Sequence, residues 1–219
     1  MSADWQLLGE RADFELVRER LAAWEEQRRS EIVRFEHAGR ALWLKGSPFR
    51  GRSRWRHALR GVCLRQPAPR LSEYANLRWL REHDFGAPRA LAAGVRRERG
   101  LPRYQFLLTE EWDAARTWED VLEAGRDEPR RADALALLAA EVGRLHAQGF
   151  VHRDLYPRNV LLRERGAQLE LGFLDAWRGG AGFDLRGPGY DLACWMLSGA
   201  ELLDASNSAM PSALLPPGS

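Results

Sequence analysis

The chain has 219 residues, enough for one large domain or two small lobes, and its 45% hydrophobic content is ordinary for a globular protein. Its formal net charge of +2 argues against binding of polyanions through overall charge, so we expect no nucleic-acid partner. No apolar run approaches the roughly 18 residues of a membrane span, and the start carries no secretion signal. These features favour a cytoplasmic protein. Cys63 and Cys194 lack metal-ligand spacing and indicate reduced, packed thiols.

One basic residue differs from all the others. Among the 33 basic residues, Lys45 is the only lysine. Wherever mere positive charge is needed the sequence uses arginine, so a lone lysine marks a position where a compact ammonium group is required. The alternative is that one lysine survived a coding bias by accident.

The N-terminal part predicts a helix followed by a hairpin. Residues 13–28 carry an apolar stripe at i, i+3, i+7 and i+10, which is typical of an amphipathic helix. From Glu31 the apolar period changes to two, and residues 31–45 are typical of a β-hairpin that turns at residues 37–40. Lys45 ends the second strand and shares a face with Trp43, which either lies against a purine or belongs to the core.

Residues 46–70 show the least regular pattern. Arginines crowd around Trp55 and His57, and prolines stand at 48, 67 and 69. Such a basic, aromatic-bearing loop is suited to contact anionic lipid head groups through Arg50–Arg60, or nucleic acid. A solvated surface is the more common explanation of such a run.

A second helix is predicted over residues 71–82, with Ser72 as its cap. Glu73 lies one turn before Leu77 on the same face. In kinases a glutamate on such a helix pairs with the strand lysine that contacts the α- and β-phosphates of the nucleotide. Glu73 is therefore our candidate partner for Lys45, and Glu82 is the other choice.

Two strands and a lobe boundary follow. Residues 90–95 and 104–109 read as strands, after which residues 110–112 lead into a helical pattern from Trp118. A strand followed directly by a helix is suited to form a hinge between two lobes, and the backbone groups of such a hinge can bind adenine. Glu110 and Trp112 are therefore candidate nucleotide-binding residues. The boundary is expected near Trp112, with residues 1–111 as the N-lobe.

The clearest helical pattern in the chain spans residues 130–148, and a polar loop at residues 151–159 follows it. This loop, VHRDLYPRN, matches the kinase catalytic-loop pattern H-R-D-L-x-x-x-N. In that pattern the aspartate, here Asp154, accepts the proton of the acceptor hydroxyl, and the asparagine, here Asn159, binds magnesium. The alternative is an exposed turn with an ion-paired aspartate.

The C-terminal part predicts a second hairpin and a helix. Strand patterns at residues 159–163 and 168–174 end at Asp175, which is placed to supply a second acid. After a glycine-rich segment, residues 190–197 look like a buried helix headed by Asp191. We expect a C-lobe over residues 112–205 and a disordered tail over residues 206–219.

These residues together suit phosphoryl transfer, which needs charge neutralisation and alignment more than covalent help. Asp154 would take the acceptor proton, and Asn159 with Asp175 would bind Mg²⁺. Lys45, fixed by Glu73, would hold the phosphates of ATP. His152, Arg153 and Asp191 are expected to support the loop.

Other enzyme classes fit the sequence less well. The five histidines lack H-x-x-x-H spacing and no C-x-x-C is present, which argues against a zinc enzyme. There is neither a G-x-S-x-G elbow nor a G-x-x-x-x-G-K-[ST] loop, so two common hydrolase and NTPase signatures are missing.

With these motifs in view, the chain resembles the kinase-like superfamily and, within it, the lipopolysaccharide kinase family of Gram-negative bacteria, the Kdo and heptose kinases. The likeness runs over residues 32–203. It implies an α+β, two-lobed fold with a small antiparallel N-lobe sheet and a mostly helical C-lobe. It also implies Mg²⁺ and ATP as cofactors, and as acceptor a hydroxyl of an inner-core sugar or a similar lipid-linked sugar, at the inner membrane face.

The chain departs from protein kinases in several ways. No G-x-G-x-x-G precedes Lys45, the metal motif reads L-D-A-W in place of D-F-G, and no A-P-E follows. Only 28 residues follow Asp191, so the C-lobe is short or truncated, which favours a small or lipid-linked acceptor over a peptide. The alternative functions are a nucleotide-binding pseudokinase with a regulatory role and a protein serine/threonine kinase.

Overall fold

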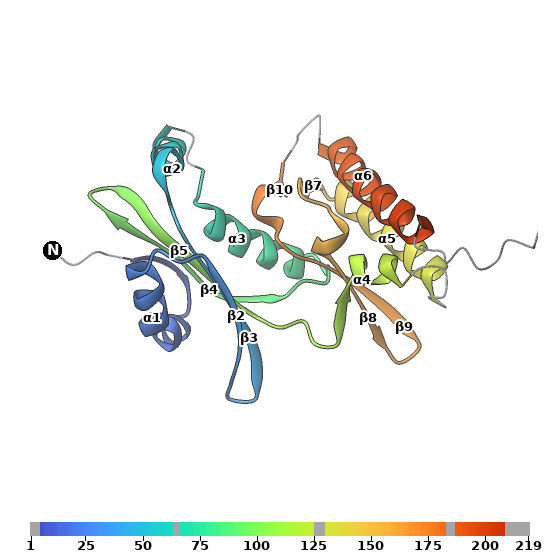
Figure 1. The fold of residues 1–219 in the computed structure, drawn as a ribbon, viewed down its shortest axis with the longest axis horizontal. Coiled ribbons are helices and arrows are strands. Elements are labelled where there is room, and N and C mark those ends of the chain that lie inside the picture. The colour runs from blue at the N-terminus through green and yellow to red at the C-terminus, as the bar shows by residue number, and fades with distance from the viewer. Residues whose placement is uncertain (1–4, 64–65, 125–129, 183–186, 209–219) are drawn as a thin grey trace, which may run out of the picture. The chain divides into compact units, whose positions relative to one another are not determined.

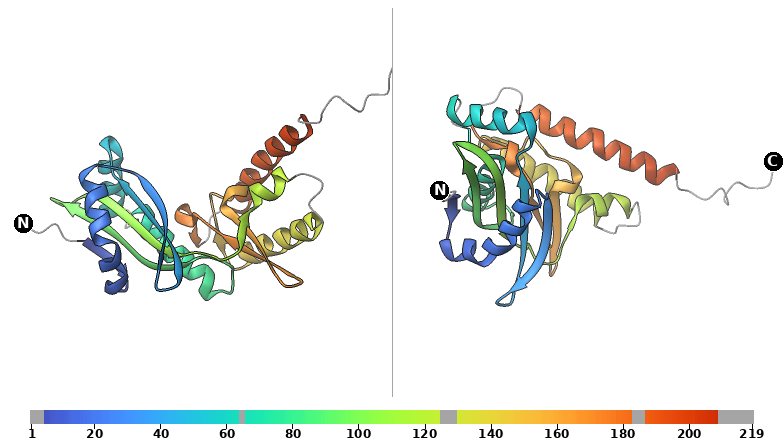
Figure 2. Two further views of the ribbon diagram at one scale, coloured as in Figure 1. Left: turned by 60° about the horizontal axis from the view of Figure 1, so that its bottom comes forward. Right: turned by 60° about the vertical axis from the view of Figure 1, so that its left-hand side comes forward.

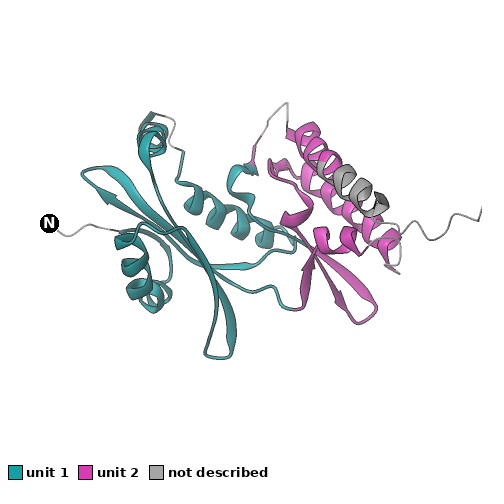
Figure 3. Ribbon diagram, in the orientation of Figure 1, with its two compact units in different colours: residues 1–113, 172–180 teal, residues 114–171, 181–219 magenta. Residues whose placement is uncertain are grey.

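The computed structural model describes residues 5–63, 66–124, 130–182 and 187–208, and Figure 1 shows its elements. These residues form two compact units (Figure 3). One comprises the chain up to Asp113 together with Gly172–Gly180, and the other comprises Ala114–Leu171 and the chain from Ala181. We call them unit 1 and unit 2. The lobe bounds expected from the sequence stay a prediction.

Unit 1 is built on a five-stranded antiparallel sheet with the strand order β1-β4-β5-β3-β2. Three helices and a short 3-10 helix, η3, accompany it. The elements are β1 (Trp5–Gly9), α1 (Arg11–Glu26), β2 (Glu31–His37), β3 (Arg40–Pro48), α2 (Gly51–Cys63), α3 (Pro69–Glu82), β4 (Arg89–Glu98), β5 (Leu101–Glu110) and η3 (Ala176–Arg178).

The first helix and the hairpin expected from the sequence are confirmed as α1 and β2–β3. The hairpin closes through a two-residue loop, Ala38-Gly39, in which both residues have positive φ (50° and 73°). Such a turn matches the right-handed twist of paired strands, and it fixes the register that places Ile32 opposite Lys45. Strand β1 was not expected from the sequence.

The two faces of this sheet carry different helices. Because side chains alternate along a strand, Leu42 and Leu44 of β3 point to one face and Lys45 to the other. Helix α1 packs on the first face, and Glu73 of α3 reaches Lys45 on the second. The buried core under α1 comprises Phe14, Val17, Leu21, Leu42, Leu44, Leu91, Ala92, Tyr104, Phe106 and Leu108.

The expectation of an irregular basic loop after Lys45 was wrong, because Gly51–Cys63 forms helix α2. Its start is stabilised by Ser53, whose hydroxyl accepts the backbone N–H of Arg50 (3.2 Å) and donates to the Arg50 carbonyl (2.6 Å). Arginine, alanine and leucine are also good helix formers. Cys63, expected to be packed, is exposed on this helix.

Helix α3 agrees with the sequence prediction except at its cap. The N-cap residue is Ala68, with Pro69 in the first turn, and Ser72 does not cap the helix. Proline suits the first turn because its missing N–H would have no intrahelical partner there. The buried residues of α3 include Glu73, Leu77 and Leu80, which form the stripe that faces the sheet.

Unit 2 combines three helices with short strands. Its three-stranded sheet has the order β6-β8-β9, and β7 pairs with β10. The elements are β6 (Ala115–Thr117), α4 (Trp118–Glu123), α5 (Arg131–Ala147), β7 (Phe150–Val151), the 3-10 helix η2 (Pro157–Asn159), β8 (Val160–Arg165), β9 (Gln168–Phe173), β10 (Gly180–Ala181) and α6 (Gly187–Ser208). The last residues of β9 and the first of β10 belong to unit 1.

The predicted helix over residues 130–148 is confirmed as α5, and the second hairpin as β8–β9. The helix expected at 190–197 exists within α6, but it is buried on one side only. Asp191 and Cys194 are buried, whereas Leu192 and Met196 are exposed. Only some of the apolar residues at 190–197 therefore pack against the rest of unit 2, and the others face solvent. The tail expected from Ser206 falls mostly on residues outside the described ranges.

In the described part of the chain, no helix combines the length and the apolar character needed to cross a bilayer.

Candidate functional site

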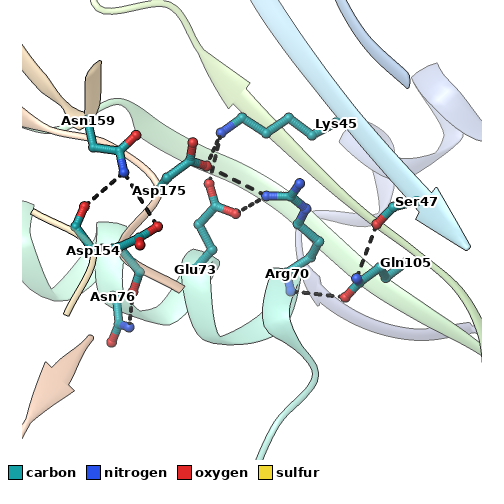
Figure 4. Close-up of polar contacts among 10 residues, drawn as sticks. Lys45, Ser47, Arg70, Glu73, Asn76, Gln105, Asp154, Asn159 and Asp175 are labelled. Carbon is teal, nitrogen blue, oxygen red and sulfur yellow. Dashed lines mark hydrogen bonds and ion pairs between the residues drawn. The ribbon is translucent and has the colours of Figure 1, made fainter. Parts of the chain in front are cut away.

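Lys45 lies at the centre of a polar cluster in unit 1 (Figure 4). Its Nζ donates to Glu73 Oε1 at 3.0 Å and to Asp175 Oδ1 at 2.6 Å. Strand β3 aims the lysine at the α3 side of the sheet, and Asp175 follows β9, so three segments distant in sequence meet here. The structure thus brings together the lone lysine and two of the acids singled out in the sequence.

Of the two glutamates considered for Lys45, Glu73 makes the contact. Its side chain is only 1% exposed, whereas Glu82 is exposed and pairs with Arg78 one turn earlier. The two glutamates are nine residues apart, so at about 100° per residue they lie on opposite faces of the helix. Glu73 shares the buried stripe of Leu77 and Leu80, and Glu82 cannot.

Arg70 is a member of this cluster that the sequence analysis missed. Its guanidinium hydrogen-bonds to Glu73 Oε2 and lies 3.7 Å from Asp175 Oδ1. Its backbone N–H donates to Gln105 Oε1 (3.2 Å), and Gln105 in turn donates to Ser47 (3.1 Å). The spacing of three residues between Arg70 and Glu73 on a helix was the available signal. Two cations therefore share the two carboxylates.

The mutual charges shift the pKa values of the central pair. Burial raises the pKa of the Asp175 carboxyl, but Lys45 and Arg70 outweigh burial, and the net pKa lies below the usual value. For Lys45 burial lowers the pKa, while Glu73 and Asp175 raise it to a net value above the usual one. Both groups are thus held in their charged forms at neutral pH.

The backbone around Asp175 is fixed from α3. Asp175 has the left-handed φ of 50° and directly precedes η3. Asn76 Nδ2 donates to the carbonyl oxygens of Ala176 (2.6 Å) and Gly179 (2.9 Å) at the two ends of that short helix. A non-glycine residue persists at positive φ only where its surroundings hold it. Helix α3 therefore supplies both the partner of Lys45 and the support of Asp175.

Replacing Glu73 by glutamine should lower the free energy of unfolding by about 2 kcal/mol, because two largely buried cations would lose their shared anion. Urea denaturation of the purified variant measures the change. Glu82→Gln is the matched control on the same helix, and it should cost no more than about 0.5 kcal/mol because its ion pair is exposed. Equal losses for the two variants would contradict the role of Glu73.

The loop of residues 151–159 belongs to unit 2 and carries Asp154 and Asn159 (Figure 4). Asn159 is buried at the end of η2, and its Nδ2 donates to the carbonyl oxygen of Asp154 at 2.8 Å and lies 3.5 Å from Asp154 Oδ2. This orientation directs the amide oxygen Oδ1 away from Asp154. Asn159 thereby fixes the backbone of Asp154 and keeps an oxygen ligand available.

Asp191 holds the start of the same loop. It is fully buried, and its Oδ2 accepts the backbone N–H of His152 (2.9 Å) while its Oδ1 accepts that of Arg153 (2.6 Å). His146 Nε2 lies 3.0 Å from Asp191 Oδ2. Arg153 has a left-handed φ of 59°, a conformation that such paired hydrogen bonds can hold. The structure thus places His152, Arg153 and Asp191 in one network, to which it adds His146.

The end of β5 and the segment that follows it hold the two residues considered for the nucleotide base. Glu110 ends β5, with a carboxylate oxygen 3.8 Å from Arg89, and Trp112 packs over Gly172, where a Cβ would meet the indole at 2.8 Å. Between them, Glu111 accepts hydrogen bonds from Arg34 and from Trp43 Nε1. Trp43, which had two interpretations, is tied to this segment by that bond.

Each unit carries an oxygen group whose chemistry suits magnesium. Mg²⁺ prefers oxygen ligands, typically one or two carboxylates with phosphate oxygens and water. Asp175 offers a carboxylate kept ionised by its cationic neighbours, and Asn159 offers the amide oxygen described above. Across the residues that the structure describes, no group of three or more His, Cys, Asp and Glu side chains is placed to hold a metal by itself.

Comparison with known proteins gives both sequence and structural matches. The model of the lipopolysaccharide kinase (Kdo/WaaP) family matches residues 14–182. The fold is similar to that of WaaP, solved in complex with acyl carrier protein, with a TM-score of 0.60 and 20% identity over 94% of this chain and 90% of that one. It is also similar to the Rio2 kinase of Chaetomium thermophilum, solved as an ADP/Mg²⁺-phosphoaspartate complex, with a TM-score of 0.58 and 17% identity over 95% of this chain and 65% of that one.

These likenesses confirm the fold class expected from the sequence, an α+β protein-kinase-like fold with an antiparallel sheet in its N-terminal part.

Proposed function

This chain belongs to the lipopolysaccharide kinase (Kdo/WaaP) family, and from that membership we propose that it transfers the γ-phosphate of ATP to a hydroxyl group of a lipopolysaccharide inner-core sugar, or of a similar lipid-linked acceptor. The observation that supports this most directly is the contact of Lys45 Nζ with both Glu73 and Asp175. A kinase needs a cation for the phosphates and an acid for the metal, and this contact holds the two candidate groups side by side.

Lys45 would bind the nucleotide phosphates. Its ammonium is a compact charge with three donors, which suits phosphate oxygens approached from several directions. Glu73 fixes its position from the buried side. Arg70 contacts Glu73 and lies near Asp175, so a cation would stay beside both carboxyl groups when the lysine contacts the phosphates. Glu110 and Trp112 would place the adenine through the backbone of their segment.

Asp175 and Asn159 would supply the oxygen ligands of magnesium, which when bound neutralises charge that develops on the phosphates. Asp154 would accept the proton of the sugar hydroxyl as that oxygen attacks phosphorus. The contact between Asn159 and the Asp154 carbonyl sets the base in position. His152, Arg153 and Asp191 would keep the loop in shape through the network around Asp191.

Replacing Asp175 by alanine should weaken magnesium-dependent nucleotide binding by roughly tenfold or more, since an oxygen ligand is lost. Thermal shift with ATP, with and without Mg²⁺, measures this. A ligand at 100 times its dissociation constant stabilises by about 2.7 kcal/mol, so lost affinity appears as a smaller shift. Asp133→Ala, at an exposed position on α5, is the control. An unchanged Mg²⁺-dependent shift in Asp175→Ala would contradict the assignment.

Incubation of the purified protein with labelled ATP and a panel of lipid-linked sugars tests the transfer itself. Label in a Kdo- or heptose-containing acceptor is the expected result. Label in a casein-like protein but in no sugar would favour a protein serine/threonine kinase. A magnesium-ATP thermal shift without any transfer would favour a pseudokinase. Because the similar WaaP was solved with acyl carrier protein, that protein should be added in a parallel series. We place the reaction at the cytoplasmic face of the inner membrane.

A further inference from the structure

Helix α2 presents apolar and basic side chains together to solvent. After its first residue, Gly51, its exposed residues follow a helical spacing and form a single face, which comprises Arg52, Trp55, Arg56, Leu59, Arg60 and Cys63. Trp55 is 66% exposed and Leu59 is 65% exposed, which makes them two of the most exposed large apolar residues of unit 1. In a helix that served only to cover the sheet, these two side chains would point inward.

The opposite face of α2 fixes the helix to unit 1. The His57 ring packs edge-on against the buried Phe49, with ring centroids 5.2 Å apart. Arg54 Nε donates to the carbonyl oxygen of Pro102 at 3.1 Å, and the Arg54 guanidinium lies 3.7 Å from Glu98. The helix is therefore held beside β5 by its half-buried side, near the edge of unit 1 in Figures 1 and 2. This attachment determines which residues face solvent.

The charge of α2 differs from that of the rest of the chain. The helix carries four arginines, at positions 52, 54, 56 and 60, and no acidic residue, whereas the whole chain has a net charge of only +2. Three of these arginines are on the exposed face, and only Arg54 has an acidic partner among the ion pairs found in the described residues. The exposed face is thus positive and apolar at once.

We propose that the exposed face of α2 docks unit 1 onto an anionic lipid bilayer. Arginine guanidiniums at positions 52, 56 and 60 would bind lipid phosphates, while Trp55 and Leu59 enter the interface between headgroups and acyl chains. Tryptophan is favoured at that depth, and arginine stems lie along apolar surface with the charge kept in the headgroup region. The docking needs neither nucleotide nor acceptor, so it does not depend on the proposed transfer reaction.

The mixture of side chains favours lipid over nucleic acid. A phosphate backbone would use the three arginines but leave Leu59 without an apolar partner, whereas a bilayer interface accommodates both kinds of side chain. Binding to an acidic protein would also use the charges, but the helix offers no acidic residue with which a mixed protein surface could form reciprocal pairs. The bilayer is the partner that matches the whole face.

Vesicle co-sedimentation of the full chain tests the proposal, with vesicles of equal parts phosphatidylglycerol and phosphatidylcholine compared with phosphatidylcholine alone. We expect binding to the anionic vesicles only. The triple variant Arg52→Gln, Arg56→Gln, Arg60→Gln should bind about a hundredfold more weakly, at about fivefold for each arginine. The double variant Trp55→Ala, Leu59→Ala should lose at least about tenfold. All five residues are exposed, so thermal unfolding of the variants should match that of the parent chain.

The matched control neutralises three exposed arginines of α1 in the same unit, Arg11→Gln, Arg18→Gln and Arg20→Gln. It has the same net charge as the α2 triple variant and should retain binding to anionic vesicles. An equal loss in both triple variants would overturn a specific docking face. Vesicle binding that is retained in the Trp55/Leu59 variant would overturn the lipid assignment. The same holds if the chain binds nucleic acid through α2 and does not bind vesicles. Failure of phosphate transfer with intact vesicle binding would refute only the proposed function.

Discussion

Replacing Asp154 by asparagine should lower the turnover of phosphate transfer by about a thousandfold and leave nucleotide binding intact. A positioned general base contributes typically about 10² to 10⁴ in rate, and an amide cannot accept the proton of the acceptor hydroxyl. The substitution preserves shape, and the hydrogen bond from Asn159 reaches the backbone carbonyl of residue 154, which the variant retains. Steady-state transfer with labelled ATP measures the loss, and thermal shift measures nucleotide binding.

Asp133→Asn serves as the control for this change. Asp133 lies on α5 in the same unit, with its side chain 72% exposed and its carboxylate 3.9 Å from Arg130. The control should transfer phosphate at the parental rate. Normal turnover in Asp154→Asn would show that the proton leaves by another route, and a parallel loss of nucleotide binding would show that Asp154 acts on the nucleotide as well.

Replacing Asp191 by alanine should reduce the free energy of unfolding by about 3 to 4 kcal/mol, because two backbone N–H groups and His146 would lose a fully buried acceptor. Arg153 would also lose the hydrogen bond that accompanies its left-handed backbone. We therefore expect the loop of residues 151–159 to lose its shape and, if the proposed function holds, turnover to fall with stability. Urea denaturation followed by circular dichroism measures the first effect, and the labelled-ATP assay measures the second.

Asp191→Asn separates the acceptor from the charge. The asparagine oxygen can still accept one of the two backbone N–H groups, so this variant should be less destabilised than the alanine variant. Asp133→Ala, which removes an exposed carboxylate, should change the unfolding free energy by no more than about 0.5 kcal/mol. If Asp191→Ala unfolded at the parental urea concentration, the network around the loop could not be what holds it.

Local patterns in the sequence were sufficient to predict most of the elements. The hairpin β2–β3 has a clear change of period and a turn that needs positive φ, and α5 has a sustained apolar stripe. Helix α2 has apolar residues at a helical spacing, at 55, 58, 59 and 62. The prediction missed it because many arginines interrupt this pattern and prolines flank it. Strand β1 is only five residues long and depends on its pairing with β4, which no local pattern reveals.

The polar cluster around Lys45 was predictable in part. Its lysine and acids stand out by type and motif, but the choice of Glu73 over Glu82 depends on which side of α3 faces the sheet. Arg70 and Asn76 carry no motif, since arginine and asparagine are common on helix surfaces. Their places in the cluster follow from contacts with residues more than 100 positions away in sequence, Asp175 for Arg70 and Gly179 for Asn76. Such contacts are set by tertiary packing and cannot be predicted from local sequence patterns.

The lone lysine, which lies inside the sheet of unit 1, also provides a way to measure how often that sheet opens. Strand β3 is paired with β2 on one side and with β5 on the other, so the peptide bond after Lys45 lies inside a hydrogen-bonded ladder. A lysine-specific endoprotease has no other lysine at which to cut. Each cleavage event then records an opening of this one sheet, and the rate of cleavage measures how often unit 1 opens under native conditions.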